Sequence, residues 1–317
     1  MAVLSGSASI CQLGFIAKDA EATANAYAEF FRLAPPFCIW TDPVEATQMT
    51  YLGRLADGRA KLAFLQTASL QLEFMQPDEG ESGWKDFLEQ SGEGFHHFAV
   101  KVTGMREKLA QLEALGIDVL QKGEFAGGRY ACLDTAARLG AIVELLEEDA
   151  PAPAGNVGNW DSAATDPTED NALGTKRIVH LGFLVEDAAR TAAAYAELFG
   201  APTKSFRTAP YEESRTTYLG KPADGQALIY LVDMGSIQIE LIQPDGGTSV
   251  WRNDLEANGE GFHHLAFDHV KQVPERLPAL EARGIAVTQR GEFAGGAYTY
   301  LDAKASLKTN LELLERW

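Results

Sequence analysis

The stretch GEGFHHFAV at residues 92–100 recurs as GEGFHHLAF at residues 259–267. Outward from this pair, four further matches keep the same order along the chain: ICQLGFIAKD at 10–19 with IVHLGFLVED at 178–187, LQLEFMQPD at 70–78 with IQIELIQPD at 237–245, GEFAGGRYACLD at 123–134 with GEFAGGAYTYLD at 291–302, and IVELLE at 142–147 with NLELLE at 310–315. The offset between partners is 167 or 168 residues throughout. The chain is therefore predicted to be a tandem duplication, with a first module at 1–148 and a second module at 176–317.

The segment between the modules, residues 149–175, differs in composition from both of them. It is rich in Pro, Gly, Ala, Asn and acidic residues. Such a composition is typical of an extended linker. We therefore expect a linker long enough to let the two modules pack side by side.

The composition also restricts the classes of function. The chain has 317 residues, with 27 Lys and Arg against 45 Asp and Glu, and a formal net charge of −18. An acidic protein is a poor partner for nucleic acid or for an anionic membrane, because both are bound through basic side chains. Cys11, Cys38 and Cys132 are too few for a disulfide framework, and no apolar run approaches the roughly 18 residues of a membrane span. We expect a cytoplasmic protein with no nucleic-acid or membrane partner.

Both modules are predicted to contain the same order of helices and strands. In the first, the apolar pattern predicts strands near residues 10–17, 49–52, 61–65, 70–76, 97–102, 130–133 and 142–146, and helices near 19–33, 84–90 and 105–116. Asp19 is the expected N-cap of the first helix. The repeated GEFAGG is expected either as a hairpin turn or as the rim of a pocket. This order corresponds to two βαβββ units in each module, an α+β fold.

Polar side chains interrupt four apolar strands of the second module. Because successive side chains of a strand point to opposite faces, one face away from the helices is predicted to carry His180, Glu240, His264 and Glu312. The corresponding residues of the first module are Gln12, Glu73, His97 and Glu144. A single residue of this kind is more often solvated or structural, but two imidazoles and two carboxylates on one face suit a divalent metal of borderline hardness. Gly182 and Ala266 are expected to leave room for a ligand beside the ion.

With these residues in view, both modules resemble the vicinal oxygen chelate superfamily, which includes glyoxalase I, methylmalonyl-coenzyme A epimerase, extradiol dioxygenases and bleomycin-resistance proteins. The resemblance implies that two βαβββ units form a curled, eight-stranded mixed sheet around a metal. It implies one ligand set of His180, Glu240, His264 and Glu312, and another of Gln12, Glu73, His97 and Glu144. The first-strand sequence HLGFLVED is similar to that of epimerase-type members. His96 and His263 are expected to point to the opposite face.

The resemblance implies a metal-dependent enzyme, a lyase, isomerase or epimerase that acts at a carbon next to a carbonyl through a metal-stabilised enolate. The expected cofactor is a divalent ion (Zn, Ni, Co, Mn or Fe), and the expected partner is a small carbonyl-containing substrate. The catalytic base is expected among Glu312, Glu240, Glu144 and Glu73. The modules are expected to pack with each other, and a homodimer stays open.

Two other functions and two site arrangements remain open at this point. An extradiol-type dioxygenase holds iron(II) with two histidines and one carboxylate, so Glu240 is one carboxylate too many. A metal-free binding protein of the bleomycin-resistance type would leave buried carboxylates without a cation. Each site could be closed within its own module, or halves could be exchanged, so that Gln12 and Glu73 join His264 and Glu312.

Overall fold

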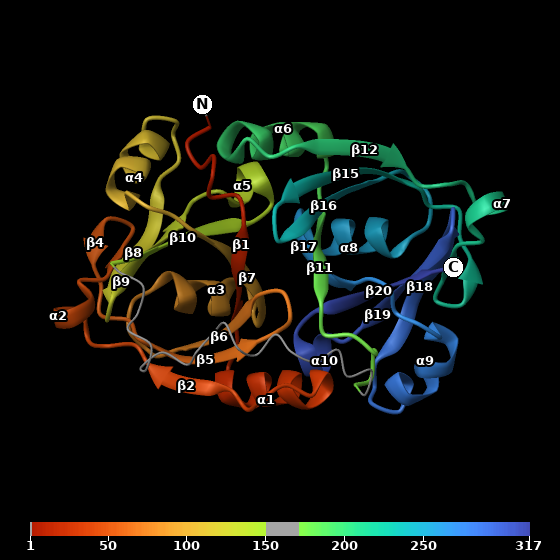
Figure 1. The fold of residues 1–317 in the computed structure, drawn as a ribbon, viewed down its shortest axis with the longest axis horizontal. Coiled ribbons are helices and arrows are strands. Elements are labelled where there is room, and N and C mark those ends of the chain that lie inside the picture. The colour runs from red at the N-terminus through yellow and green to blue at the C-terminus, as the bar shows by residue number, and fades with distance from the viewer. Residues whose placement is uncertain (1, 150–170) are drawn as a thin grey trace.

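A computed structural model describes residues 2–149 and 171–317 (Figure 1). Most of the predicted linker, residues 150–170, lies outside the described part of the chain. In that part the chain forms two curled mixed sheets, one built from residues 10–148 and the other from residues 178–316. The tandem architecture of two equivalent modules, each with a curled mixed sheet, is thus confirmed.

The two sheets have the same strand order. In the first it is β2-β5-β6-β1-β7-β10-β9-β8-β3-β4, with β1 (Ile10–Ile16), β2 (Phe37–Trp40), β3 (Thr50–Tyr51), β4 (Arg54–Leu55), β5 (Ala60–Gln66), β6 (Gln71–Pro77), β7 (Gly94–Lys101), β8 (Val119–Phe125), β9 (Gly128–Leu133) and β10 (Ile142–Glu148). In the second it is β12-β15-β16-β11-β17-β20-β19-β18-β13-β14, with β11 (Ile178–Leu184), β12 (Thr203–Arg207), β13 (Thr217–Tyr218), β14 (Lys221–Pro222), β15 (Ala227–Met234), β16 (Ile237–Pro244), β17 (Gly261–Phe267), β18 (Ala286–Phe293), β19 (Gly296–Asp302) and β20 (Asn310–Arg316).

Each described sheet therefore has ten strands where eight were predicted. The difference is a pair of two-residue strands, β3–β4 or β13–β14, that form a hairpin on the edge strand β8 or β18. Each sheet draws all its described strands from one module, so the two halves of a sheet are not exchanged between modules. The centre of each sheet is a set of four neighbouring strands, β6-β1-β7-β10 or β16-β11-β17-β20.

Helices pack against the sheets at equivalent places in both modules. They are α1 (Ala20–Phe31), α2 (Val44–Thr47), α3 (Gly83–Ser91), α4 (Met105–Glu113), α5 (Ala136–Leu139), α6 (Ala188–Phe199), α7 (Tyr211–Ser214), α8 (Val250–Asn258), α9 (Val273–Glu281) and α10 (Lys304–Leu307). Helix α1 begins as predicted, because the Asp19 carboxylate accepts a hydrogen bond from the Ala22 amide at 2.9 Å. Asp187 caps α6 in the same way through the Arg190 amide.

One hydrophobic core continues from the first module into the second. Phe95 of β7 stacks on Phe262 of β17, with ring centroids 4.3 Å apart. The Tyr27 hydroxyl of α1 donates to the Leu307 carbonyl of α10, and the Tyr195 hydroxyl of α6 donates to the Leu139 carbonyl of α5. Figure 1 shows these two helix pairs on opposite sides of the junction between the modules. The modules therefore pack through a pseudo-symmetric interface of large buried side chains.

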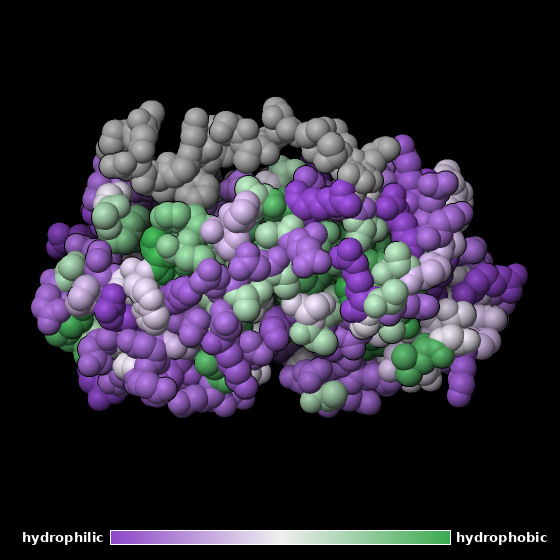
Figure 2. Space-filling view, turned by 90° about the horizontal axis from the view of Figure 1, so that it is seen from below, coloured by the Kyte–Doolittle hydropathy of each residue, from purple (hydrophilic) through white to green (hydrophobic). Residues whose placement is uncertain are grey.

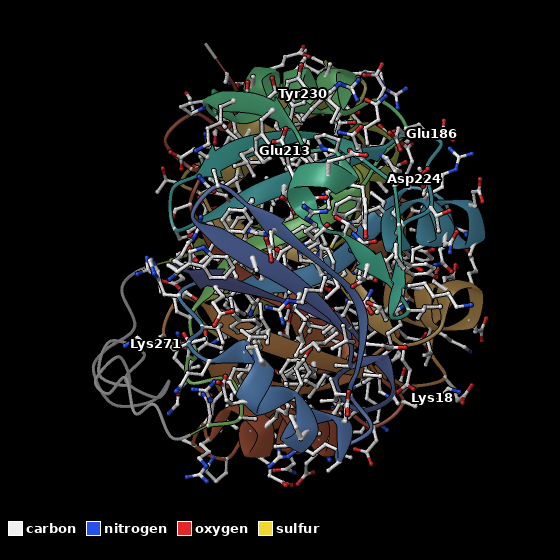
Figure 3. All side chains as sticks on the ribbon, turned by 90° about the vertical axis from the view of Figure 1, so that its right-hand side faces the viewer. Lys18, Glu186, Glu213, Asp224, Tyr230 and Lys271 are labelled. Carbon is white, nitrogen blue, oxygen red and sulfur yellow. The ribbon has the colours of Figure 1, made fainter. Side chains whose placement is uncertain are left out.

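The outer surface is mainly polar. In Figure 2 hydrophilic residues cover most of the face seen from below, with hydrophobic residues scattered between them. Figure 3 looks onto the second module and shows side chains filling both sides of its curled sheet. Among the described residues, no helix has the length and hydropathy needed to cross a membrane.

Candidate metal centre

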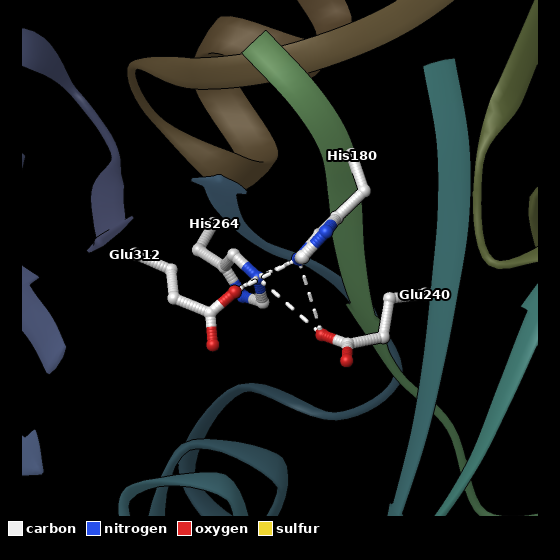
Figure 4. Close-up of side chains that lie close together, drawn as sticks. All are labelled: His180, Glu240, His264 and Glu312. Carbon is white, nitrogen blue, oxygen red and sulfur yellow. Dashed lines mark hydrogen bonds and ion pairs between the residues drawn. The ribbon is translucent and has the colours of Figure 1, made fainter. Parts of the chain in front are cut away.

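The four central strands of the second sheet bring the four predicted residues to one point. His180 lies on β11, Glu240 on β16, His264 on β17 and Glu312 on β20, and all four are buried. Gly182 of β11 is in register with both Glu240 and His264, while Ala266 of β17 is in register with both His180 and Glu312. We call this group the second centre; in Figure 4 its side chains point toward one another from four strands.

The donor atoms of the second centre are close together. The two Nε2 atoms of His180 and His264 are 3.2 Å apart. His180 Nε2 lies 2.8 Å from Glu312 Oε2 and 3.4 Å from Glu240 Oε2. His264 Nε2 lies 3.3 Å and 3.5 Å from the same two oxygens. All four residues offer a ligand atom within 4.8 Å of the others.

These separations fit the coordination sphere of a divalent metal. Ligands about 2.1 Å from a metal are about 3.0 Å apart at right angles and about 3.4 Å apart at tetrahedral angles. The five donor pairs that involve a histidine span 2.8–3.5 Å, which covers both values. The second centre can therefore hold one ion with four protein ligands, and six-fold coordination would leave two positions for other oxygens.

Carboxylate oxygens that lack a hydrogen bond also indicate a cation at this place. Glu240 Oε2 and Glu312 Oε2 are buried and make no hydrogen bond to any residue in the described part of the chain. A buried carboxylate oxygen without a partner is costly, so native proteins normally pair such atoms or bind a metal with them. The donor set thus fits a metal by its chemistry as well as by its spacing.

The first module repeats only part of this arrangement. Glu73, His97 and Glu144 form a buried cluster, which we call the first centre, with His97 Nε2 3.7 Å from Glu73 Oε2 and 3.3 Å from Glu144 Oε2. Gln12 occupies the register position of His180, but its amide nitrogen donates to Gln71 Oε1 at 2.6 Å. Gln12 therefore lies at the predicted place with its amide nitrogen engaged, and its amide oxygen is the atom that could act as a ligand.

The expected role of Gly182 is wrong. A Cβ atom on Gly182 would lie 1.9 Å from Cε1 of His264, and one on Gly14 would lie 2.1 Å from Cε1 of His97. The space beside each glycine is thus filled by the histidine ring of the neighbouring strand. Glycine is needed here so that the ligand histidine can lie flat across the first strand and reach the centre.

The expected orientation of His96 and His263 is also wrong. The register of β7 against β1 shifts between His97 and Phe95, which leaves His96 as the extra residue of a β-bulge, and β17 has the same shift at His263. A bulge breaks the strict alternation of side chains. His96 Nδ1 consequently lies 2.9 Å from His97 Nδ1, and His263 Nδ1 lies 3.0 Å from His264 Nδ1. Each ligand histidine is therefore held at Nδ1 and presents Nε2 to its centre.

The charge balance differs between the two centres. Burial disfavours a charged His180, but Glu240 and Glu312 outweigh it and raise the pKa of His180 to about 10. Burial alone would raise the pKa of Glu312, yet His264 and His180 bring it below its usual value. In the first centre, burial and then Glu144 raise the pKa of Glu73 to about 8, against a smaller lowering by His97. Burial disfavours a charged His97 as well, but Glu144 and Glu73 outweigh it and raise the pKa of His97, so the first centre favours protonation at both the carboxylate and the imidazole.

Two positions near the centres were not singled out in the sequence. Cys132 of β9 is in register with Glu144, and its Sγ lies 3.8 Å from Glu144 Oε1. Tyr300 of β19 is in register with Glu312, and its ring packs 4.9 Å from that of His264. Cys132 and Tyr300 occupy the same position in the two repeats, and this difference between the modules is the signal that could have found them. The smaller Cys132 side chain lines a cavity of about 160 Å³ beneath α3, which also touches Trp84.

The repeated GEFAGG forms a hairpin turn between β8 and β9 and between β18 and β19. Gly127 at the first of these turns has a φ of +92°, which a residue with a side chain rarely adopts. Arg129, which follows the turn, pairs with Glu147 at 2.7 Å and with Asp149. This arginine is thus paired with two acids at the end of β10, Glu147 within the strand and Asp149 just after it.

Comparison with known proteins gives a consistent result. A profile described as Glyoxalase/Bleomycin resistance protein/Dioxygenase superfamily matches residues 11–133 and 179–300. The uncharacterized protein YqjC of Bacillus subtilis (strain 168) is 28% identical over 92 residues, which cover 28% of this chain and 66% of that protein.

Solved structures share the fold across nearly the whole chain. A mutant of 4-hydroxymandelate synthase from Streptomyces coelicolor is 15% identical, with a TM-score of 0.58 over 98% of this chain and 93% of that one. A xylose isomerase-like TIM barrel/4-hydroxyphenylpyruvate dioxygenase fusion protein is 13% identical, with a TM-score of 0.50 over 99% of this chain and 50% of that one. At these identities the likeness concerns the fold alone.

Proposed function

Because the chain belongs to the glyoxalase, bleomycin resistance protein and dioxygenase superfamily, we propose that it is a metal-dependent enzyme that moves a proton at a carbon next to a carbonyl. The proposed reaction class is that of a lyase, isomerase or epimerase, and the proposed active site is the second centre. The observation that carries the proposal is the convergence of two buried imidazoles and two buried carboxylates within metal-ligand distances.

The residues of the second centre would hold the ion and the substrate together. His180, His264 and one oxygen each of Glu240 and Glu312 are the proposed ligands. When bound, a divalent ion supplies Lewis-acid stabilisation of the negative charge that develops on a carbonyl oxygen as the neighbouring proton leaves. The strand backbone fixes these side chains in advance, so little reorganisation is needed during the reaction.

The proton itself would be moved by a carboxylate. Glu240 and Glu312 come from the two outer strands of the four, β16 and β20, with both histidines on the strands between them. In Figure 4 the second oxygen of each carboxylate points away from the point where the donors meet. A base on each side of the centre suits removal of a proton from one face of a carbon and its return on the other. This arrangement supports isomerisation or epimerisation within the proposed class.

The two other functions have less support. A dioxygenase centre of two histidines and one carboxylate leaves three positions for a bidentate substrate and oxygen, whereas four ligands leave two on a six-coordinate ion. A metal-free binding site would leave Glu240 Oε2 and Glu312 Oε2 buried without a hydrogen bond among the described residues, with His180 and His264 as their ion-pair partners.

The proposal is tested on the purified full chain. Elemental analysis should find at least about one divalent metal ion per chain. Incubation in D₂O with a panel of small ketones, hydroxyketones and acyl thioesters should show deuterium entering the α-position of at least one compound by ¹H NMR, and chelation should stop it. Protein that takes up no metal would contradict the proposal in favour of a binding protein, and oxygen consumption with catechols would contradict it in favour of a dioxygenase.

A further inference from the structure

A chain of three side chains runs from helix α8 to the second centre. Asp254 of α8 places Oδ2 3.3 Å from Nε2 of His263. His263 Nδ1 lies 3.0 Å from Nδ1 of His264, whose Nε2 faces the centre. Both imidazoles are buried, and the Asp254 side chain is 22% exposed. The contacts therefore connect a partly solvated carboxylate to a buried metal ligand.

Metal binding fixes which way hydrogen bonds run along this chain. If His264 Nε2 is a metal ligand it carries no proton, so His264 Nδ1 must carry one and donate it. His263 Nδ1 then accepts, and the proton of His263 lies on Nε2, facing the Asp254 carboxylate. In this arrangement His264 Nδ1 has His263 Nδ1 as its acceptor. Among the described residues, the one acidic oxygen within 4 Å of His263 Nε2 is Asp254 Oδ2, at 3.3 Å, an ion-pair contact rather than a full hydrogen bond.

The first module lacks the acid at the equivalent position. Phe87 of α3 precedes Asp254 by the repeat offset of 167 residues and packs its ring edge-on to His96, with centroids 5.0 Å apart. His96 and His97 repeat the contact between the two Nδ1 atoms at 2.9 Å. The two modules therefore share the histidine pair and differ in the group beyond it, since a phenyl ring has no carboxylate oxygen to accept a proton.

We propose that Asp254 is a positioning residue for the metal: through His263 it fixes His264 in the tautomer that presents an unprotonated Nε2 and makes that nitrogen a stronger donor. Acceptors behind a metal-bound histidine commonly raise metal affinity by about 10–100-fold. Lys304, 3.4 Å from the same Asp254 oxygen, keeps the carboxylate at the surface end of the chain. The inference rests on the proposed metal centre, but it concerns binding rather than turnover.

The test measures Zn²⁺ affinity of the full chain by competition with a chromophoric chelator. Asp254→Asn and Asp254→Phe should each weaken zinc binding by the second centre about 10–100-fold. Asp254→Glu, which keeps the acid, should retain most of the parental affinity. Glu256→Gln is the matched control, because Glu256 lies on the same helix and pairs with Arg252 at the surface. Phe87→Asp should strengthen zinc binding by the first centre.

A second readout separates tautomer control from a loss of structure. In ¹⁵N-histidine NMR of the zinc-loaded parent, His264 should carry its proton on Nδ1 and His263 on Nε2, and Asp254→Phe should shift the His263 signals while near-UV circular dichroism is unchanged. Equal zinc affinity in Asp254→Asn and the parent overturns this inference and leaves the metal centre standing. A parent that binds no zinc overturns both. If Asp254→Asn does not fold, an unchanged first centre in Phe87→Asp overturns the inference.

Discussion

Glu312 and Glu240 differ from the histidines beside them because only a carboxylate can both bind a metal and accept a proton from carbon. Glu312→Gln keeps an oxygen of similar size in place but removes its basicity. We expect this variant to retain metal and to lose α-proton exchange by about 10²–10⁴-fold, the usual contribution of a positioned acid or base. The measurement is ¹H NMR in D₂O with the compound that exchanges fastest in the parent, with metal content determined on the same samples.

Glu240→Gln is the matched variant for the proton transfer. If both variants hold metal and exchange at the parental rate, neither carboxylate is the base and the assignment is wrong. A loss confined to one variant identifies the base.

We expect Gln12 to make the first centre bind metal more weakly than the second. An amide oxygen is a weaker donor than an imidazole for zinc, nickel, cobalt and iron, and the Gln12 amide is already hydrogen-bonded to Gln71. We expect a chelator titration of the parent to remove metal in two steps, the first centre losing it before the second. Gln12→His should bring the steps together, with Gln71→Ala as the control that frees the amide. A single step in the parent would contradict this.

The raised pKa of Glu73 predicts that the stability of the metal-free protein depends on pH. Its pKa is about 8 in the fold against an ordinary value of 4.5, so the folded state holds the proton more tightly than the unfolded state does. The resulting stability is complete below about pH 4.5 and is lost as pH rises toward 8. Urea unfolding of chelator-treated protein at pH 5 and pH 8.5 should show a loss on the order of a few kcal/mol in the parent and a smaller loss in Glu73→Gln. The same pH dependence in both proteins would be inconsistent with a raised pKa at Glu73.

At the scale of elements, strand β11 makes room for the His264 ring because it has a glycine, Gly182, beside that ring. Gly182→Ala would place a Cβ atom 1.9 Å from the His264 ring, so the ring must move off its ligand position. We expect at least a tenfold loss of metal affinity at the second centre and a loss of about 1–3 kcal/mol in unfolding free energy, as for other overpacked sites. Chelator competition and urea unfolding measure the two effects.

Gly246→Ala serves as the control for that substitution, because a Cβ atom there meets no heavy atom within 4 Å. Unchanged metal affinity in Gly182→Ala would show that the His264 ring has another way to reach the centre.

The β-bulge in β17 has a comparable effect on the histidine pair. In a regular strand His263 and His264 would face opposite sides, and no hydrogen bond could join them. The shifted register opposite Gly182 and Phe183 brings both rings to the buried side. Strand irregularity therefore creates the contact on which the proposed Asp254 chain depends.

At the scale of the whole molecule, the modules depend on each other for their core. Residues 2–149 expressed alone would expose Phe95, Tyr27 and the rest of the shared core that the second module covers. We expect this fragment to aggregate or to lack a cooperative unfolding transition. Mixing it with residues 171–317 should restore a soluble protein with a cooperative transition. Size-exclusion chromatography and near-UV circular dichroism provide the measurement. A monomeric fragment with its own sharp transition would show that the interface is dispensable.

Much of the fold and of the candidate site follows from local sequence patterns. The repeat offset predicts two equivalent modules, and strand alternation predicts that His180, Glu240, His264 and Glu312 share a face. The strand predicted near 49–52 corresponds to β3, but β2, β4 and β8 were not predicted. Phe37–Trp40 and Arg54–Leu55 are short, largely exposed strands with a weak apolar pattern, and Val119–Phe125 is only partly buried. Asp254 was missed because an acid on a helix is ordinarily solvated, and only its contact with His263 distinguishes it.

The sequence by itself determined the duplication, the order of elements and the identity of the residues on the inner face, because each of these depends on spacing within one strand or between repeats. Only the tertiary structure decided that each centre closes within its own module, that His264 fills the space beside Gly182, and that Phe95 and Phe262 join the modules. The physical reason is that these contacts join residues far apart along the chain. Which of them form depends on strand pairing, bulges and close packing of the whole core, which no local period encodes.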